Sequence, residues 1–264
     1  MGERATFTVA TFNVNSARAR EPNILAWLEN RRPDVALLQE IKCLDEQFPR
    51  PGIEALGYHI ETKGQKAYNG VAIISKLPIE QVITRVLPGD DDDDHARYIE
   101  ADIAGIRLAS LYLPNGNPAP GPKFDYKLAW MDRLIKRANE LLALEVPFVL
   151  AGDYNVIPSD IDVYDPKALA SDALGRPESK DRFQTLKNLG LVDAFRVLNP
   201  HSQTYSYWDY QAGAYQKDHG WRIDFLMCSP QAADRLVAAD IDRSPRAKEK
   251  ASDHTPAWAE FTLS

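Results

Sequence analysis

Four acidic residues stand at the ends of apolar runs, or interrupt them, where strands are expected. An unpaired charge in such a position is costly, so each carboxylate needs a partner. One such residue alone is more often a turn former or an ion-pair partner than part of a functional site. Four together indicate a shared chemical role. The four residues are Glu40, Asp153, Asp224 and Asp253.

Carboxylates at these positions favour a hard divalent metal ion. Such oxygens select Mg²⁺ or Mn²⁺, and Mg²⁺ keeps several waters while it binds a substrate phosphate. The five histidines and two cysteines show no spacing typical of a zinc site. Asp153 and Asn155 lie two residues apart, on the same side if the backbone is still extended there, so one could orient water while the other holds a phosphate oxygen. The pattern favours hydrolysis of a phosphate ester.

Several other classes of protein lose their usual support. The sequence has no glycine-rich loop for nucleoside triphosphates or dinucleotides and no nucleophile elbow of a serine hydrolase. No stretch approaches the ~18 uninterrupted apolar residues of a membrane span, and no apolar segment follows the N-terminal charges. Cys43 and Cys228 are too few for a disulfide framework and lie in runs expected to be buried strands. We therefore expect an unexported, cytoplasmic protein without a membrane partner.

The elements that must position these residues are strands, single or in hairpins, mixed with two or three helices. Helices are expected from about residue 22 to Pro33, and over 127–144 before Pro147. An antiparallel hairpin is expected around Ala104-Gly105. Two mixed sheets flanked by helices fit this order best. The expected strands are 6–14, 35–39, 70–75, 97–103, 107–113, 148–151, 223–227 and 258–263.

Length and charge limit the organisation of the chain. With 264 residues, 44% of them apolar, and no repeat or linker, residues 1–264 are expected to form a single domain. A net charge of −7 argues against a protein that coats nucleic acid, but an enzyme needs only a local positive face. The run Asp90 to Asp94 supplies five of the negative charges and is expected to be a solvated loop.

Seven sequence blocks, in this order, resemble the motifs of the exonuclease III family of abasic-site endonucleases, within the endonuclease/exonuclease/phosphatase superfamily. The resemblance extends over nearly the whole chain and implies a four-layered α/β sandwich, with two mixed β-sheets packed face to face and flanked by helices. The blocks are Thr11-Phe-Asn-Val-Asn15, Leu38-Gln-Glu-Ile-Lys-Cys43, Asn69-Gly-Val-Ala-Ile74, Leu111-Tyr-Leu-Pro-Asn-Gly116, Ala151-Gly-Asp-Tyr-Asn155, Gly220-Trp-Arg-Ile-Asp224 and Ser252-Asp-His-Thr-Pro256.

The resemblance also implies roles for individual residues. Glu40 would be the principal ligand of Mg²⁺, for which Mn²⁺ is an alternative, with Asn15 and Asp253 near the metal. Some family members carry Asp at the position of Asn15, so the number of metal ions stays open. Asp153 would position or deprotonate the attacking water, and Asp224 would hold the ring of His254. The general base is open between Asp153 and His254. The residues expected to grip the scissile phosphate are Asn13, Tyr112, Asn155 and His254.

Substrate recognition is expected in loops beside this centre. In an aromatic segment that begins at Thr204, the resemblance implies that Tyr207, Trp221 and Ile223 wall a pocket for a flipped-out sugar without a base. Gln211 matches a position that reaches into the duplex. The segment 117–127 matches another DNA-contacting loop. Further residues expected to contact the substrate are Asn115, Lys123 and Lys127, the two lysines through phosphates.

The resulting prediction is a Mg²⁺-dependent DNA repair phosphodiesterase, an exodeoxyribonuclease III-like monomer. It would cut 5′ to abasic sites in duplex DNA, leaving a 3′-hydroxyl and a 5′-phosphate, and remove 3′ nucleotides or 3′ blocking groups. Two alternatives stay open. One is a phosphatase of the same superfamily that acts on a small phosphate ester or a phosphoinositide. The other is a catalytically silent DNA- or protein-binding module with the same fold.

Overall fold

Apolar runs without alternation form the central strands. Val35–Gln39 (β2) and Val71–Ser75 (β4) are buried at every position, which is typical of strands covered on both faces. The edge strand Gln81–Thr84 (β5) has no fully buried residue. The computed structural model describes residues 5–263, and every strand in this part of the chain belongs to one of two sheets.

The first sheet has six strands in the order β11-β12-β1-β2-β4-β3. β1 and β2 are parallel, and the other neighbours are antiparallel, so the sheet is mixed. Its remaining strands are β1 (Thr6–Asn13), β3 (His59–Lys63), β11 (Leu236–Ile241) and β12 (Ala257–Thr262).

The second sheet has six strands in the order β5-β6-β7-β8-β10-β9. β7 and β8 are parallel, and the others are antiparallel. The hairpin expected around Ala104-Gly105 is confirmed, because β6 and β7 pair from Ile103 and Ile106 outward. Its remaining strands are β6 (Tyr98–Ile103), β7 (Ile106–Tyr112), β8 (Phe148–Asp153), β9 (Val192–Asp193) and β10 (Asp224–Cys228).

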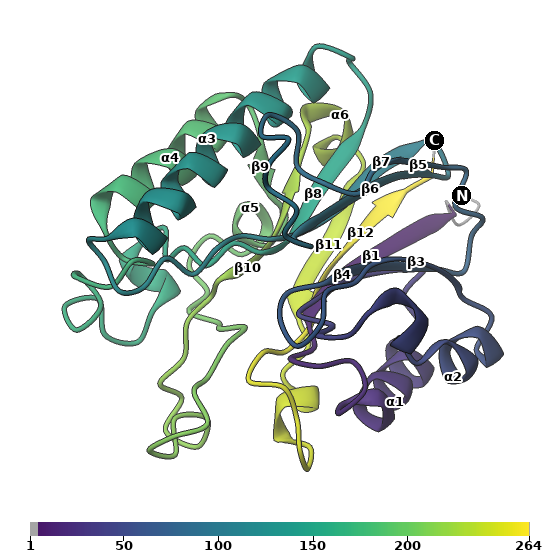
Figure 1. Ribbon diagram of the computed structural model, residues 1–264, viewed down its shortest axis with the longest axis horizontal. Helices are drawn as coiled ribbons and strands as arrows, with labels where there is room; N and C mark the ends of the chain where they lie inside the picture. Colours follow the sequence, from purple (N-terminus) through teal and green to yellow (C-terminus); the bar gives the residue numbers. More distant parts are fainter. Residues whose placement is uncertain (1–4, 264) are drawn as a thin grey trace.

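Helices cover the outer face of each sheet. Figure 1 shows α1 and α2 on the first sheet and α3 and α4 on the second, so the order of layers is helix, sheet, sheet, helix. The helices bury apolar side chains in clusters shared with the sheets, among them Trp27 and Leu28 of α1 and Trp130 and Leu134 of α3. The predicted four-layered α/β sandwich is confirmed. The helices are α1 (Glu21–Arg31), α2 (Arg50–Ala55), α3 (Pro122–Leu142), α4 (Pro177–Asn188), α5 (Ala194–Leu198) and α6 (Pro230–Ala233).

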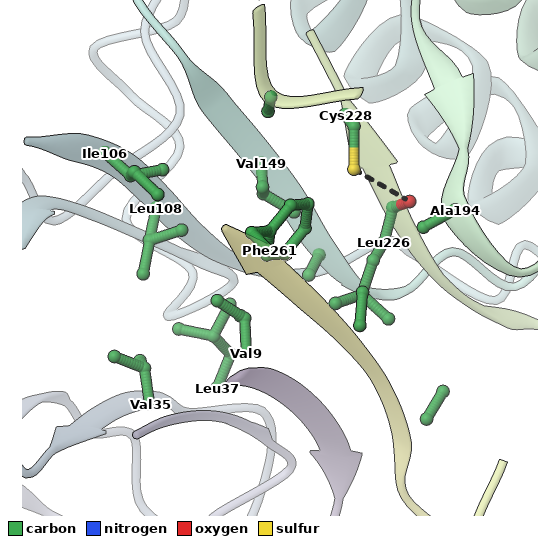
Figure 2. Close-up of a cluster of buried hydrophobic side chains, with 14 of the residues drawn as sticks. Val9, Val35, Leu37, Ile106, Leu108, Val149, Ala194, Leu226, Cys228 and Phe261 are labelled. Atoms are coloured by element: carbon green, nitrogen blue, oxygen red, sulfur yellow. Dashed lines mark hydrogen bonds between the residues drawn. The ribbon is translucent and has the colours of Figure 1, made fainter. Parts of the chain in front are cut away.

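The central core lies between the two sheets. Figure 2 shows Val9, Leu37 and Phe261 of the first sheet beside Leu108, Val149 and Leu226 of the second. Burial of each such side chain contributes about 1.5–3 kcal/mol to folding. This apolar interior holds the strand ends in fixed positions, and the polar residues of the candidate site lie at those ends.

Some expectations about single elements were wrong. The described residues form six α-helices instead of two or three, because short helices such as α5 and α6 have too few turns to show a period. Helix α3 begins at Pro122, preceded by Gly121, and not at Lys127, since proline is well suited to the first helical turn. Cys43 is buried, but it lies in a loop after β2 and not in a strand.

The acidic run Asp90 to Asp94 lies in a loop, as expected, and four of its residues are exposed. Asp93 is the exception. Its carboxylate lies 2.9 Å from the guanidinium of Arg133, and its side chain is only 5% exposed. Among the residues that the structure describes, no helix is both long enough and apolar enough to span a membrane.

Candidate active site

Strand pairing brings polar residues to one edge of the sandwich. Asn13 ends β1 beside the last residue of its parallel neighbour β2, and Glu40 follows directly. In the second sheet, Asp153 ends β8 and faces Asp224, which begins β10, in antiparallel register. His254 lies shortly before β12. The sheet topology therefore assembles residues from distant parts of the chain.

The backbone at this edge is held in an unfavourable conformation. Asn15, Glu40 and Asn155 have φ angles of 45°, 50° and 45°. A left-handed conformation costs a residue with a Cβ of order 1–3 kcal/mol, and such residues cluster at functional sites. At Gly152, an added Cβ would lie 1.8 Å from the carbonyl oxygen of Leu111, so only glycine allows β7 and β8 to approach this closely. Tertiary contacts, and not local preference, fix these strand ends.

Asn13 joins the two sheets at the centre of the site. Its Nδ2 donates to Glu40 Oε1 at 2.9 Å and to Asp153 Oδ2 at 3.0 Å. Its Oδ1 accepts the backbone N–H of Asn15 at 3.1 Å. Since a side-chain amide has two N–H hydrogens, both donors of Asn13 are used by carboxylates. Asn13 therefore fixes the distance between Glu40 and Asp153.

A second set of contacts extends from Glu40 toward the loop after β1. The ammonium of Lys42 lies 2.7 Å from Glu40 Oε2 and donates to Asn15 Oδ1 at 2.7 Å. Asn15 Nδ2 in turn donates to Asp253 Oδ1 at 3.1 Å. The three residues predicted to lie near a metal are thus connected, with a lysine cation between two of their oxygen atoms.

His254 lies between two carboxylates. Its Nδ1 is 2.8 Å from Asp224 Oδ2, and its Nε2 is 3.6 Å from Asp153 Oδ2. Ser206 Oγ donates to Asp224 Oδ2 at 2.6 Å, and Ser252 Oγ accepts the N–H of His254 at 3.2 Å. Burial opposes the imidazolium, but the charges of Asp224 and Asp153 outweigh it and raise the pKa of His254 to about 10. The ring is therefore positively charged at neutral pH.

The carboxylates of the site differ in their acidity. Burial raises the pKa of Asp153 to about 7, against the opposing charge of His254 and with the support of Asp224 and Glu40. Burial also opposes ionisation of Glu40, but Lys42 and the bond from Asn13 hold its pKa below the usual range. Asp153 can thus exchange a proton near neutral pH, whereas Glu40 stays ionised.

Tyr112 lies beside the same carboxylates at the end of β7. Burial, followed by the charges of Glu40 and Asp153, raises its pKa well above the ordinary value, so the phenol keeps its proton. The guanidinium of Arg97 lies 4.7 Å from the centre of its ring. A neutral phenol fixed in this way can donate a hydrogen bond to an anion.

Asn155 is held by the protein itself. Its N–H donates to Asp153 Oδ1 at 2.9 Å, its Nδ2 donates to Leu113 O at 2.9 Å, and Asn115 Nδ2 donates to its Oδ1 at 3.2 Å. The interpretation that Asp153 and Asn155 share an extended backbone was wrong, because β8 ends at Asp153. The chain turns there, and this turn brings the Asn155 N–H back to the carboxylate.

Lys127 cannot serve as a surface contact for DNA phosphates. Its side chain is fully buried, and its ammonium donates to the carbonyl oxygens of Asn115 and Asn155. The prediction for Lys127 was therefore wrong: the helical spacing of α3 directs this side chain inward. Burial lowers its pKa to about 7, against the charges of Asp153 and Asp172. Lys123, one turn earlier, is exposed as expected.

The three residues predicted to wall a substrate pocket lie together. The ring of Tyr207 is 4.7 Å from that of Trp221 and 5.0 Å from that of His254. Ile223 is 2% exposed and belongs to the same apolar cluster as Tyr207 and Trp221. Gln211 is exposed, farther along this aromatic loop. An apolar surface therefore adjoins the charged centre.

Sequence reasoning missed several residues that hold the site together. Lys42 and Ser252 lie inside blocks that carry the family resemblance, but no local pattern indicated their contacts. Ser206 lies within the aromatic loop, where its hydroxyl binds Asp224. Tyr210 was also missed, and its hydroxyl accepts a hydrogen bond from Asn15 Nδ2 at 3.3 Å. In each case the partner is distant in the sequence, so only the fold shows the pairing.

Comparison with known proteins identifies relatives of the chain by sequence and by fold. Residues 10–254 match the model of the Endonuclease/Exonuclease/phosphatase family. The chain is 36% identical over 263 residues to exodeoxyribonuclease III of Haemophilus influenzae, covering 95% of this chain and 98% of that protein. A solved AP endonuclease from Archaeoglobus fulgidus has a TM-score of 0.93 at 36% identity, over 97% of this chain and 99% of the other.

A second solved structure, the 3′ phosphatase NExo from Neisseria bound to a product DNA hairpin, has a TM-score of 0.93 at 35% identity. The match covers 97% of this chain and 99% of the NExo chain. These similarities extend over almost the whole length of each protein. The chain belongs to the Endonuclease/Exonuclease/phosphatase family and, within it, to the exodeoxyribonuclease III group.

Proposed function

We propose that this nuclease is a Mg²⁺-dependent DNA repair phosphodiesterase that cuts 5′ to abasic sites in duplex DNA and trims 3′ ends. The observation that carries the proposal is the contact of Asn13 with both Glu40 and Asp153, beside a charged His254. This cluster combines an ionised carboxylate, a carboxyl that can take up a proton and a cation, which are the groups that phosphodiester hydrolysis requires.

Asp153 is proposed to position the attacking water and to accept its proton. A general base works best when its pKa is near the working pH, and burial brings the pKa of Asp153 to about 7. His254 is charged and is therefore proposed to stabilise negative charge on the phosphoryl oxygens. Asp224 keeps the ring of His254 oriented and protonated through the bond to Nδ1.

The neutral donors are proposed to act in two ways. Tyr112 and Asn155 stand at the ends of β7 and β8 beside Asp153, where a phenol O–H and an amide N–H can bind phosphate oxygens. Asn13 uses both amide hydrogens on carboxylates, so its role is to hold Glu40 and Asp153 in place. Fixed donors of this kind need little reorganisation when charge develops.

The residues present fit a hard divalent cation. The Lys42 ammonium lies 2.7 Å from both Glu40 Oε2 and Asn15 Oδ1, so oxygen atoms already converge around a positive charge. Glu40, Asn15 and Asp253 provide only oxygen donors, which Mg²⁺ and Mn²⁺ prefer. Protonated His254 is a poor ligand, although its Nε2 lies close to Glu40 and Asp153. When bound, Mg²⁺ would offset charge on the phosphate.

The apolar surface beside His254 is proposed to select abasic sites. Tyr207 and Trp221 offer carbon surface to a sugar that has no base, with the buried Ile223 packed against them, and such a nucleotide leaves the duplex with the least loss of pairing and stacking. Gln211, in the same exposed loop, is proposed to contact the duplex, and Asn115 the substrate beside Asn155.

The negative net charge of the chain is compatible with DNA binding. Several loops at the edge that carries Glu40 and Asp153 bear exposed cations, which can neutralise backbone phosphates even though the total charge is −7. A monomeric state and a cytoplasmic location stay predictions. Exposed cations on or beside these loops include Arg18, Lys66, Lys123 in the first turn of α3, Lys217, Lys248 and Lys250.

The decisive experiment compares two end-labelled duplexes, one with a central abasic analogue and one intact with a recessed 3′ end, in Mg²⁺ and in EDTA. We expect Mg²⁺-dependent nicking at the abasic position and slower laddering from the 3′ end. Asp153→Asn should lower kcat by at least ~100-fold with little change in DNA affinity. Asp160→Asn, which removes an exposed carboxylate outside the cluster, is the matched control.

Two outcomes would contradict the proposal. The first is no cleavage of either duplex while an inositol phosphate or another small phosphate ester is hydrolysed, which would favour the phosphatase alternative. The second is undiminished DNA binding without any turnover in Mg²⁺ or Mn²⁺, which would identify a silent binding module.

A further inference from the structure

Tyr210 combines an exposed ring with a fully engaged hydroxyl. The residue is 52% exposed, so its ring is not an anchor for the core. Its hydroxyl accepts from Asn15 Nδ2 at 3.3 Å and from Arg20 NH2 at 3.2 Å, and donates to Ala251 O at 2.9 Å. A phenol has one donor and two acceptor sites, and all three are used. Three segments that are distant in the sequence therefore meet at one oxygen atom.

Two of these segments carry the oxygen donors proposed for the metal. Asn15 contacts Asp253 Oδ1 through its Nδ2 and receives a bond from Lys42, which also pairs with Glu40. Ala251, whose carbonyl oxygen accepts the third bond, lies two residues before Asp253 in the sequence. The hydroxyl of Tyr210 thus restrains the side chain of Asn15 and the backbone that leads to Asp253.

The loop that carries Tyr210 is attached to the rest of the site in a second way. Figure 1 shows the segments around residues 205–220 and 242–252 projecting from the same side of the sandwich. The Arg246 guanidinium bridges them, since it lies 5.2 Å from the ring of Tyr210 and donates to Trp208 O at 3.0 Å. Tyr210 is therefore held in position from both the ring and the hydroxyl end.

We propose that Tyr210 is a positioning residue for the metal site: its hydroxyl orients Asn15 and the segment before Asp253, and so links the aromatic substrate loop to metal affinity. The inference rests on the proposed function, in which Asn15 and Asp253 donate oxygen atoms to a divalent cation. Loss of a hydrogen-bond partner behind a metal ligand commonly weakens metal affinity about 10- to 100-fold. Because this hydroxyl is at the surface, we expect an effect of about 3- to 10-fold, below that range.

Tyr215 provides a matched control in the same loop. Its hydroxyl contacts Arg243, whose carbonyl oxygen lies 3.5 Å away, and its ring packs against Trp208 at 5.3 Å. Neither contact leads to Asn15, Asp253 or Glu40. Tyr→Phe removes the same hydroxyl group at both positions, so only the place of the lost oxygen differs.

The test measures Mn²⁺ binding to the full-length chain by electron paramagnetic resonance, without DNA. Tyr210→Phe should raise the Kd for Mn²⁺ about 3- to 10-fold, and Tyr215→Phe should leave it unchanged. The double variant Tyr210→Phe/Asn15→Ala should weaken Mn²⁺ binding by less than the product of the two single effects, because part of the effect of Tyr210 passes through Asn15. At saturating Mg²⁺, kcat of Tyr210→Phe on abasic duplex should stay within about 2-fold of the unmodified chain, since a positioning residue affects mainly metal occupancy.

Circular dichroism and DNA affinity in EDTA serve as checks that Tyr210→Phe keeps its fold and its DNA contacts. Unchanged Mn²⁺ affinity in Tyr210→Phe would overturn the inference, and so would effects of Tyr210→Phe and Asn15→Ala that simply add. Glu40→Gln separates this failure from failure of the proposed function. If Glu40→Gln weakens Mn²⁺ binding and Tyr210→Phe does not, only the role of Tyr210 is wrong. If neither variant weakens it, the proposed metal site is wrong as well.

Discussion

His254 Nδ1 lies 2.8 Å from Asp224 Oδ2, and both residues are almost completely buried. The carboxylate keeps the imidazole protonated in a place where burial alone would remove its charge. The same bond leaves Nε2 directed toward Asp153, 3.6 Å away. One contact therefore sets both the charge and the direction of the ring that faces the proposed phosphate position.

Replacement of Asp224 should change the alkaline limit of activity. In Asp224→Asn the negative charge is lost, so the pKa of His254 falls from about 10, by about 1–3 units. Because the protonated ring is the proposed active form, activity is lost as pH rises through this pKa. At pH 6 the variant and the unmodified chain should turn over at similar rates, but as pH rises the variant should lose activity at lower pH than the unmodified chain does. A kcat profile on abasic duplex from pH 6 to 10 measures the shift.

Ser206→Ala is the control for this experiment. It removes the hydroxyl that donates to Asp224 Oδ2 at 2.6 Å but keeps the carboxylate charge. Its alkaline limit should stay close to that of the unmodified chain. An identical alkaline limit in Asp224→Asn and the unmodified chain would show that the charge of His254 does not control turnover.

The strands of this fold were predictable where local pattern and tertiary environment agree. The run Val35–Gln39 is apolar up to its last residue and forms a strand with those same ends, buried on both faces. The short helices α5 and α6 were not predictable, because four or five residues cannot show a helical period. Their ends are set by Asp193 and Ser229, whose side chains accept N–H groups of the first turn.

In the candidate active site, the types of residue indicated which residues belong to the site, but the sequence did not indicate which of them contact one another. Carboxylates at strand ends indicated a shared centre, and the structure joins Glu40 to Asp153 through Asn13. Which atoms meet depends on the registers of two sheets that pack face to face, and no local sequence pattern contains that information. Lys127 shows the same limit: Lys123, one helical turn earlier on the same side of α3, is exposed, whereas Lys127 is buried by the segments that contain Asn115 and Asn155.

Glu40→Gln should weaken the affinity of the site for metal without unfolding the protein. Glutamine keeps an oxygen that can accept the bond from Asn13 but removes the charge that pairs with Lys42. We expect the Mg²⁺ concentration for half-maximal nicking to rise at least about 10-fold, the lower end for loss of a group that supports metal binding. A Mg²⁺ titration of the nicking rate measures this change. Glu140→Gln, an exposed carboxylate on α3, should not alter the titration; an unaltered Glu40→Gln titration would remove Glu40 from the metal site.

Lys127 should make the stability of the chain depend on pH. Its pKa is about 7 in the folded chain, whereas an unfolded lysine has a pKa near ~10.4. Between these values the unfolded state binds more protons, so the free energy of unfolding rises with pH, by at most about 1.4 kcal/mol per pH unit. Below about pH 7 this contribution is constant, because both states are protonated. As the pH increases from 7 to 10, the folded chain loses this buried charge, and the destabilisation caused by burying it disappears.

Lys127→Met removes this linkage together with two hydrogen bonds to the carbonyl oxygens of Asn115 and Asn155. Near pH 7, removal of the buried charge offsets part of the free-energy cost of leaving the two carbonyls unpaired. At pH 9 Lys127 is already neutral in the folded chain, so its replacement brings no such offset. The variant should therefore be destabilised more at pH 9 than at pH 7, as measured by urea unfolding. Lys123→Met, which changes an exposed lysine in the first turn of α3, should show no such trend. A stability difference for Lys127→Met that is constant with pH, or larger at low pH, would mean that Lys127 stays protonated in the fold.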